Sequence, residues 1–172
     1  MPPAARPGAN VFEYGSGAST VWLARRGAQI RSIEHHDAWF TLMQTRIERY
    51  SKIDLTLVPQ DSKMSKDPLF HSQKEGYLGT SFEAYVRAIS RAVKTYDLIV
   101  IDGRARAACL SVAAQHLAKD GLIVFDNSKR QRYMDAIRAS AFEATHLPGL
   151  TPALPYPDQT TLLRAHPKGE RV

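Results

Sequence analysis

Blocks of apolar and polar residues alternate along the chain, and their spacing switches between that of strands and that of helices. Short apolar segments predict five strands, at residues 10–14, 28–33, 53–58, 96–101 and 122–125. Apolar residues at helical spacing predict helices after these strands, at residues 18–26, 38–50, 81–93, 105–118 and 131–141. Strands that alternate with helices indicate a parallel sheet with helices on both faces.

The end of the chain departs from this alternation. Residues 142–147 and 160–165 have strand character, and the proline-rich segment between them does not suit a helix. These two strands are therefore expected to pair antiparallel at the edge of the sheet. The predicted fold class is α/β, a Rossmann-like three-layer sandwich whose mostly parallel sheet carries a C-terminal antiparallel strand pair.

The composition is that of one globular domain. The chain has 172 residues, of which 44% are hydrophobic, and no repeat or clear boundary divides it, so residues 1–172 are read as a single domain. Cys109 is the only cysteine, which excludes an internal disulfide framework and favours a reducing, cytoplasmic location. No apolar run approaches the roughly 20 residues of a membrane span, so no membrane partner is expected.

The net charge of the chain indicates the chemistry of its partners. The net charge is +6 and the sequence pI is about 9.6, which suits an anionic partner such as a nucleotide or an acidic sugar. The basic residues are dispersed and form no long run with interleaved aromatic residues, so nucleic acid is not the expected partner. The sequence is also compatible with a homo-oligomer.

The first strand ends in a glycine-containing turn. Residues 10–20, NVFEYGSGAST, run from an apolar strand through Gly15 and Gly17 into a helix. Glycines let the backbone approach a ligand closely, and a helix start offers free N–H groups, as in nucleotide-binding sites. A nicotinamide-binding fingerprint has glycine where this chain has Thr20, and a tight turn without a ligand is the alternative.

Polar residues occupy the carboxyl ends of the predicted strands. Ligands of parallel α/β sheets bind beyond that edge, so these residues are candidates for a common site. Glu34 lies 19 positions after Gly15, the spacing at which a carboxylate reaches a ribose, although a role as a helix cap is the alternative. The residues at these strand ends are Glu13, Glu34, Asp61, Asp102, Asp126 and Asn127.

Residues 59–80 form a long connection between the third strand and the next helix. The segment is polar, contains two prolines and two glycines, and shows no clear period. Connections of this length often serve as lids or binding loops. We therefore expect a lid or substrate loop here, with Phe70 and Tyr77 as possible contacts.

With these motifs the chain resembles the class I S-adenosylmethionine-dependent methyltransferases over nearly its whole length. The resemblance rests on FEYGSGAST, SIEHHD, YDLIVIDG and GLIVFDNS, which follow or contain successive strands, and on the closing strand pair. It implies that Glu34 binds the ribose of S-adenosylmethionine and that Asp61 meets the adenine. The residues to which the resemblance assigns the cofactor are Glu13, Gly15, Ser16, Gly17, Glu34, His35, Asp61 and Asp102.

A narrower resemblance concerns the catechol-type O-methyltransferases, which use a metal ion. Asp102, Asp126 and Asn127 resemble the metal ligands of that family and imply a Mg²⁺ site, since Mg²⁺ prefers oxygen ligands. The family has a lysine where this chain has Ala105, flanked by Arg104 and Arg106. Helix capping and an ordinary turn are the alternative roles of the three candidate ligands.

These observations lead to one expected function and two alternatives. The expected function is methyl transfer from S-adenosylmethionine to the hydroxyl group of a small molecule. Asp102 and Lys129, which follow the fourth and fifth strands, are the candidate catalytic residues. The alternatives are a catalytically silent cofactor-binding or regulatory protein of the same fold, and an RNA methyltransferase.

Overall fold

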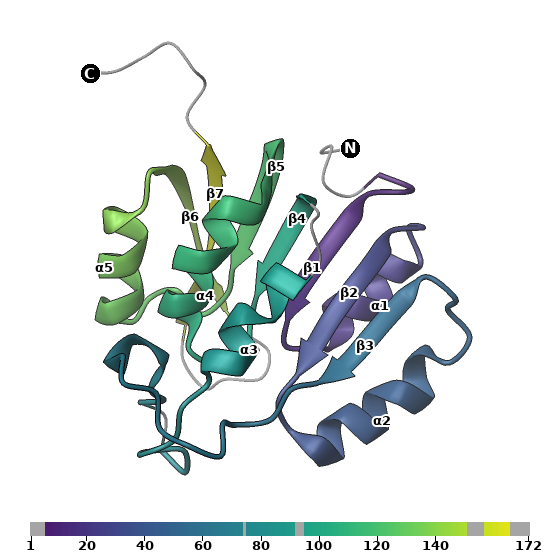
Figure 1. Ribbon diagram of the computed structural model, residues 1–172. Helices are drawn as coiled ribbons and strands as arrows, with labels where there is room; N and C mark the ends of the chain where they lie inside the picture. The colour runs from purple at the N-terminus through teal and green to yellow at the C-terminus, as the bar shows by residue number, and fades with distance from the viewer. Residues whose placement is uncertain (1–5, 74, 92–94, 151–156, 166–172) are drawn as a thin grey trace.

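A seven-stranded sheet in the order β3-β2-β1-β4-β5-β7-β6 forms the middle layer of the computed structural model (Figure 1). The structure describes residues 6–73, 75–91, 95–150 and 157–165. The strands are β1 (Asn10–Tyr14), β2 (Gln29–Glu34), β3 (Ile53–Leu57), β4 (Tyr96–Ile101), β5 (Leu117–Phe125), β6 (Phe142–Leu150) and β7 (Pro157–Ala165).

Strand direction divides this sheet into two parts. The first five strands of the chain pair in parallel, and β7 then pairs antiparallel with both β5 and β6. The continuous apolar run of β4 is explained by its place between β1 and β5, where both faces of the sheet are covered. The predicted α/β fold with a C-terminal antiparallel pair is confirmed.

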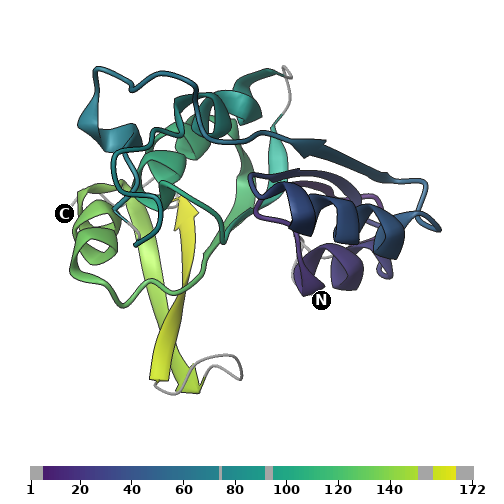
Figure 2. The same ribbon diagram turned by 90° about the horizontal axis from the view of Figure 1, so that it is seen from below.

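Helices cover both faces of the sheet. In Figures 1 and 2, α1 and α2 lie on one face, and α3, α4 and α5 lie on the other. Among the described residues, no helix has the length and apolar character that a membrane span requires. The helices are α1 (Ala18–Ala24), α2 (Asp37–Ile47), α3 (Glu83–Arg87), α4 (Arg106–Ala113) and α5 (Gln131–Ala139), with short 3-10 segments η2 (Pro68–Phe70), η3 (Ala88–Arg91) and η4 (Ala114–His116).

The two faces of the sheet bury two separate cores. The larger core lies under α3, α4 and α5 and includes Phe12, Tyr85 and Cys109, all fully buried. The smaller core lies under α1 and includes Val11 and Leu23. Phe12 and Val11 are neighbours on β1 and point to opposite faces, as the two-residue repeat of a strand requires.

Several element boundaries differ from the sequence prediction, and the largest differences concern three parts of the chain. The predicted helix 105–118 ends early, and β5 begins at Leu117 because that residue already pairs with Tyr96 on β4. The predicted helix from residue 81 divides into α3 and η3, and its expected end at residue 93 lies outside the described residues. The two C-terminal strands are also longer than predicted, with nine residues each.

The connection at residues 59–80 is anchored at its middle. Phe70 on η2 is buried in the larger core, and the backbones of His71 and Ser81 form a bridge. Tyr77 packs beside the same core. The segment therefore lies against the carboxyl edge of the sheet, where a lid or substrate loop was predicted.

Candidate functional site

The turn after β1 is held between the two neighbouring strands. The Gly15 amide donates a hydrogen bond to the carbonyl oxygen of Ile33 on β2, at 2.8 Å. A Cβ atom at Gly15 would lie 3.0 Å from the carbonyl oxygen of Asp102, which follows β4. The φ angle of Gly15 is +93°, which residues with side chains rarely adopt. Glycine at position 15 is therefore a requirement of the local geometry.

Glu13 lies beneath this turn and is fully buried. Its carboxylate accepts hydrogen bonds from the hydroxyl groups of Ser19, Thr20 and Ser32, at 2.5, 2.5 and 2.7 Å. Burial raises the pKa of Glu13 to about 7, although these hydroxyl groups act in the opposite direction. Glu13 does not line the cavity described below. The structure thus gives it a role inside the protein, tying the turn and α1 to the sheet.

Thr20 stands where a nicotinamide-binding fingerprint would have glycine. Its Oγ1 accepts a hydrogen bond from the Gly17 amide at 2.9 Å and donates one to Glu13. The threonine therefore satisfies a free amide at the start of α1 while it binds the buried carboxylate.

Glu34, the last residue of β2, faces the same turn. One carboxylate oxygen lies 3.2 Å from the Ser16 amide and 3.3 Å from the Ser16 hydroxyl, both of which donate to it. The other oxygen accepts from the amides of His35 and His36, at 2.8 and 2.9 Å. Burial raises the pKa of Glu34, but hydrogen bonds from His35 and His36 outweigh it, and the pKa is lowered. The carboxylate is held in its charged form.

His35 joins the Glu34 side of the site to the turn after β4. Its Nε2 accepts a hydrogen bond from Nε of Arg104 at 3.0 Å, because an arginine can only donate. The ring proton therefore belongs on Nδ1, which lies 2.8 Å from a Glu34 oxygen, although not in hydrogen-bond alignment. The ring also meets Tyr77, Phe82 and Tyr85 edge to face.

These groups surround a cavity at the carboxyl edge of the sheet, which we call the first cavity. Its walls are residues 15–18, residues 34–36, one side of α2 and residues 102–104. Trp39 on α2 leans over the turn, and its indole N–H donates to the Ser16 carbonyl oxygen at 2.8 Å. The first cavity thus unites Gly15, Ser16, Gly17, Glu34, His35 and Asp102 from the predicted cofactor set.

Asp61 is not brought to this cavity. Its carboxylate accepts hydrogen bonds from the Ser81 hydroxyl and from the amides of Glu83 and Ala84, at 2.8, 2.6 and 3.1 Å. These contacts satisfy free amides at the start of α3. In the structure, Asp61 therefore fastens the 59–80 connection to α3.

The predicted metal ligands surround an arginine side chain. The Arg106 guanidinium donates to Asp102 Oδ1 at 2.8 Å, to Asn127 Oδ1 at 2.9 Å, and to the carbonyl oxygen of Asp126. Its Nε donates to the Gly103 carbonyl oxygen at 3.1 Å. One guanidinium therefore occupies the point where these oxygen atoms converge.

This arrangement does not support the predicted Mg²⁺ site. The Asp126 carboxylate turns away and accepts a hydrogen bond from the Thr160 hydroxyl at 2.6 Å. In the part of the chain that the structure describes, no three His, Cys, Asp or Glu side chains are grouped as a metal would require. A permanently charged guanidinium repels a cation, so the donor set does not fit a metal.

Asp102 lies where the first cavity meets the Arg106 side chain. Its side chain is 45% exposed and lines the first cavity. Partial burial raises the pKa of Asp102 to about 6, and the charge of Arg106 opposes that rise.

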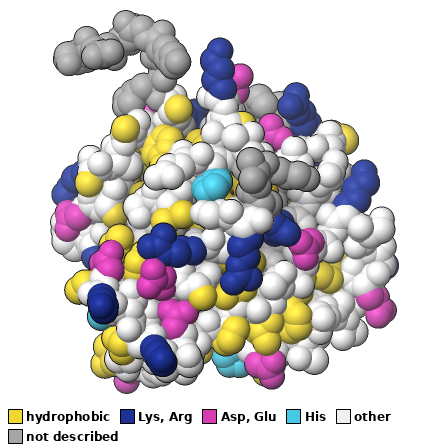
Figure 3. Space-filling view, in the orientation of Figure 1, with side chains coloured by type: hydrophobic (Ala, Val, Ile, Leu, Met, Phe, Trp, Pro, Cys, Tyr) yellow, Lys and Arg dark blue, Asp and Glu magenta, His cyan; other side chains and the backbone are white. Residues whose placement is uncertain are grey.

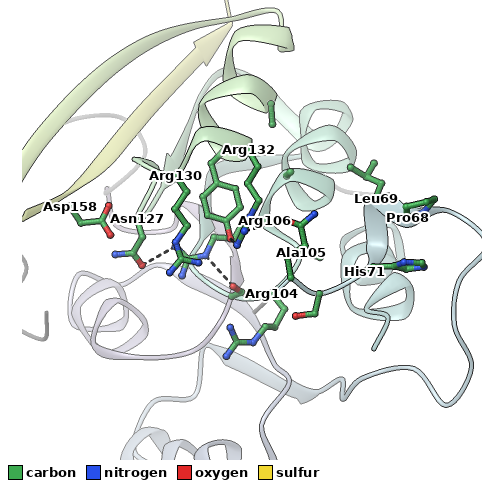
Figure 4. A pocket seen from close by; sticks show the side chains of 16 residues that line it. Pro68, Leu69, His71, Arg104, Ala105, Arg106, Asn127, Arg130, Arg132 and Asp158 are labelled. Atoms are coloured by element: carbon green, nitrogen blue, oxygen red, sulfur yellow. Dashed lines mark hydrogen bonds between the residues drawn. The ribbon is translucent and has the colours of Figure 1, made fainter. Parts of the chain in front are cut away.

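A second cavity of about 430 Å³ adjoins the first (Figure 4). It lies between the η2 region, the turn from β4 to α4, the connection from β5 to α5, and the start of β7. Gly103 and Arg104 line both cavities. Lys129, a predicted catalytic residue, is exposed and lines neither cavity, whereas Arg130 and Arg132 line the second one.

Sequence reasoning missed the roles of Arg106 and Trp39 and of the two arginines at the start of α5, Arg130 and Arg132. Trp39 carried a usable signal, because it lies in the first turn of α2, two residues after Asp37 and close to the end of β2. The sequence carried no signal for the role of Arg106, since the direction of its side chain depends on Ala105, which adopts a left-handed conformation with φ of 46°. Alanine has no special preference for that conformation.

Comparison with known proteins shows the fold. No protein-family model matches the chain, and no curated protein matches its sequence. Among solved structures, a methyltransferase-like protein from Silicibacter pomeroyi is 21% identical, with a TM-score of 0.62 over 98% of this chain and 89% of that one. An rRNA methylase from Streptococcus thermophilus is 10% identical, with a TM-score of 0.66 over 95% and 90%.

A third similar structure contains a bound ligand. A Streptococcus mutans protein whose methyltransferase activity is proposed was solved in complex with S-adenosylhomocysteine. It is 8% identical, with a TM-score of 0.65 over 93% of this chain and 90% of that one. At these identities the likeness concerns the fold. The chain therefore has the Rossmann-like fold of class I methyltransferases.

Proposed function

We propose that this protein is an S-adenosylmethionine-dependent methyltransferase. The observation that carries the proposal is the Glu34 carboxylate, which accepts a hydrogen bond from the Ser16 amide of the glycine turn in the wall of the first cavity. A carboxylate at the end of β2 beside a glycine turn after β1 is the arrangement that holds the ribose of a nucleoside ligand in parallel α/β sheets.

The residues of the first cavity fit this cofactor. Glu34 accepts hydrogen bonds from Ser16 through one oxygen, and the two hydroxyl groups of a ribose donate to a carboxylate in the same way. Trp39 and Leu42 supply an apolar wall of α2. When bound, S-adenosylmethionine would supply an electrophilic methyl group.

The second cavity is the proposed acceptor site, and a hydroxyl group of a small molecule is the proposed acceptor. Its volume is in the usual range for small-molecule sites, and it shares Gly103 and Arg104 with the first cavity. Asp102 is the proposed proton acceptor, because it lines the first cavity and directly precedes Gly103, which lines both. A carboxyl group with a pKa of about 6 is suited to general base catalysis near neutral pH. Because Arg106 fills the predicted metal position, the proposed reaction does not use a metal.

An RNA methyltransferase is the second candidate. The net charge of +6 and the similar fold of the rRNA methylase favour it. On the face seen in Figure 3, however, basic side chains are interspersed with acidic ones and form no continuous basic surface. The small-molecule proposal therefore comes first.

Calorimetric titration with S-adenosylhomocysteine tests the cofactor, with NADH as the control ligand. We expect saturable binding of S-adenosylhomocysteine alone. Glu34→Gln should weaken it at least tenfold, since a charged hydrogen-bond acceptor is lost. Glu143→Gln is the matched control, because Glu143 lies exposed on β6, away from both cavities. Binding of NADH instead, or equal affinities of wild type and Glu34→Gln, would overturn the assignment.

A second measurement separates an enzyme from a silent cofactor-binding protein. Radiolabelled S-adenosylmethionine is incubated with a panel of hydroxylated small molecules and, in parallel, with RNA, in the presence of a chelator. Label transfer to a hydroxyl compound supports the proposal. Binding of cofactor without transfer to any acceptor identifies the silent protein, and transfer to RNA alone identifies the second candidate.

A further inference from the structure

We infer that the second cavity binds a small anion, so that the methyl acceptor carries a carboxylate or phosphate group. The role of this anion as methyl acceptor rests on the proposed function, whereas anion binding by the cavity does not. The inference begins from four arginine side chains, which Figure 4 shows gathered at the cavity. They are Arg104, Arg106, Arg130 and Arg132.

Only one of these arginines is neutralised by an ion pair within the described residues. Arg106 pairs with Asp102 at 2.8 Å. The described ion pairs include none for Arg104, Arg130 or Arg132. The Arg104 guanidinium contacts His35 and the ring of Tyr77, neither of which carries a carboxylate.

The two arginines at the start of α5 are similarly free of carboxylate partners. Arg132 donates to the side-chain oxygen of Gln73 and to the Tyr133 hydroxyl, each at 3.2 Å. Arg130 is exposed and directly precedes α5, and among the described residues its side chain makes no capping hydrogen bond to that helix. Both stand at the positive end of the α5 dipole, which favours an anion in the same place.

Negative charge in the cavity wall does not balance these groups. Asp158, the one carboxylate among the lining residues, is buried, and its Oδ1 accepts from the Gln159 amide. Asp126 is turned toward Thr160. Among the residues that the structure describes, the lining therefore holds three arginines without an ion pair and a single carboxylate.

This imbalance points to an anionic ligand. A guanidinium cannot lose its proton at accessible pH, so arginines without a carboxylate partner give this cavity a standing positive charge that attracts an anion. Guanidinium groups form paired hydrogen bonds with carboxylates and phosphates. A small anion is favoured over RNA because the unpaired arginines converge on a cavity of about 430 Å³, while the face in Figure 3 mixes both signs of charge.

Calorimetry on the full chain tests anion binding directly, without cofactor. The probes are inorganic phosphate, para-hydroxybenzoate and its neutral analogue para-hydroxybenzamide. We expect the two anions to bind and the amide to bind much more weakly. Arg130→Gln and Arg132→Gln should each weaken anion binding about tenfold. Arg138→Gln is the matched control, because Arg138 lies on the same helix but pairs with Asp135 and does not line the cavity.

The outcomes separate this inference from the proposed function. Absence of anion binding to wild type at millimolar concentrations would overturn the inference, as would equal losses in Arg130→Gln and Arg138→Gln. Tight binding of an RNA hairpin that depends on Arg130, without binding of either small anion, would also overturn it. If the anions bind but S-adenosylhomocysteine does not, the inference stands and the proposed function fails.

Discussion

The backbone of Asp102 closes against Gly15 so tightly that no side chain fits between them. A Cβ atom at Gly15 would lie 3.0 Å from the Asp102 carbonyl oxygen and 3.1 Å from its carbonyl carbon. Both are main-chain atoms, which move only if the end of β4 moves. The first cavity therefore depends on this contact between the β1 and β4 ends of the sheet.

Gly15→Ala should destabilise the protein by about 1–3 kcal/mol, because it combines an unfavourable φ angle with a backbone collision. Urea unfolding measures the change. Gly17→Ala is the control, since Gly17 has an extended backbone with φ of −177° and no atom within 4 Å of an added Cβ. Equal stabilities of the two variants would show that the contact with Asp102 relaxes easily.

Glu13→Gln should remove a pH dependence of stability. The pKa of Glu13 is raised from 4.5 to about 7 in the folded state, so the folded protein keeps a proton that the unfolded chain loses in this range. The Glu13 contribution is therefore most favourable below pH 4.5 and is lost as pH rises toward 7. Relative to Glu13→Gln, wild type should lose about 2–3 kcal/mol of unfolding free energy between these limits.

Urea unfolding of wild type and Glu13→Gln over this pH range provides the measurement. Glutamine keeps the size of the side chain, and the three surrounding hydroxyl groups can rotate to donate or accept. A difference between the two proteins that stays constant with pH would show that Glu13 is ionised throughout.

Tyr85→Phe should leave stability unchanged or raise it by up to about 1 kcal/mol. Within the residues that the structure describes, the buried Tyr85 hydroxyl has no hydrogen-bond partner. A Cβ at Gly103 would overlap that hydroxyl oxygen and lie 2.9 Å from Tyr85 Cζ. Gly103→Ala should therefore cost less stability in the Tyr85→Phe protein than in wild type.

A double-mutant cycle over Tyr85→Phe and Gly103→Ala measures this coupling by thermal or urea unfolding. Additive effects would mean that the hydroxyl does not limit residue 103. A strong loss in Tyr85→Phe alone would reveal that the hydroxyl is satisfied in solution.

Chelation should leave both cofactor affinity and activity unchanged. Arg106 binds the oxygen atoms of Asp102, Asn127 and Asp126 that a Mg²⁺ ion would need. Calorimetry with S-adenosylhomocysteine, with and without EDTA, provides the check. Restoration of lost affinity or turnover by added Mg²⁺ would contradict the placement of Arg106.

Arg106→Ala should destabilise the protein by about 2 kcal/mol, because several partly buried oxygen atoms lose their donor. Arg138→Ala, on exposed α5 surface, serves as the control in urea unfolding. Similar small losses in both variants would show that water replaces the guanidinium without cost.

The sequence predicted the sheet well, because strand patterns are local. Five strands and the C-terminal pair follow from apolar runs and prolines, and the described residues contain all of them. The early start of β5 was missed, since it depends on Leu117 pairing with Tyr96 on β4. Pairing between distant segments overrides local helix preference there.

The candidate site was predicted less completely. The spacing of Gly15 and Glu34 identified two facing groups of the first cavity, which the fold brings together as expected. Asp61 was assigned from its position after β3, but its carboxylate is used by the start of α3. Side-chain direction decides such cases, and strand order alone does not determine it.

Arg104 lines both cavities and holds His35, which itself adjoins Glu34. A ligand that draws the Arg104 guanidinium toward one cavity would change the hydrogen-bond donors available in the other cavity. By thermodynamic linkage, the factor by which one ligand alters the affinity of the second must equal the factor by which the second alters the affinity of the first. The shared arginine would thus make the coupling between the two cavities a measurable, reciprocal property of the protein.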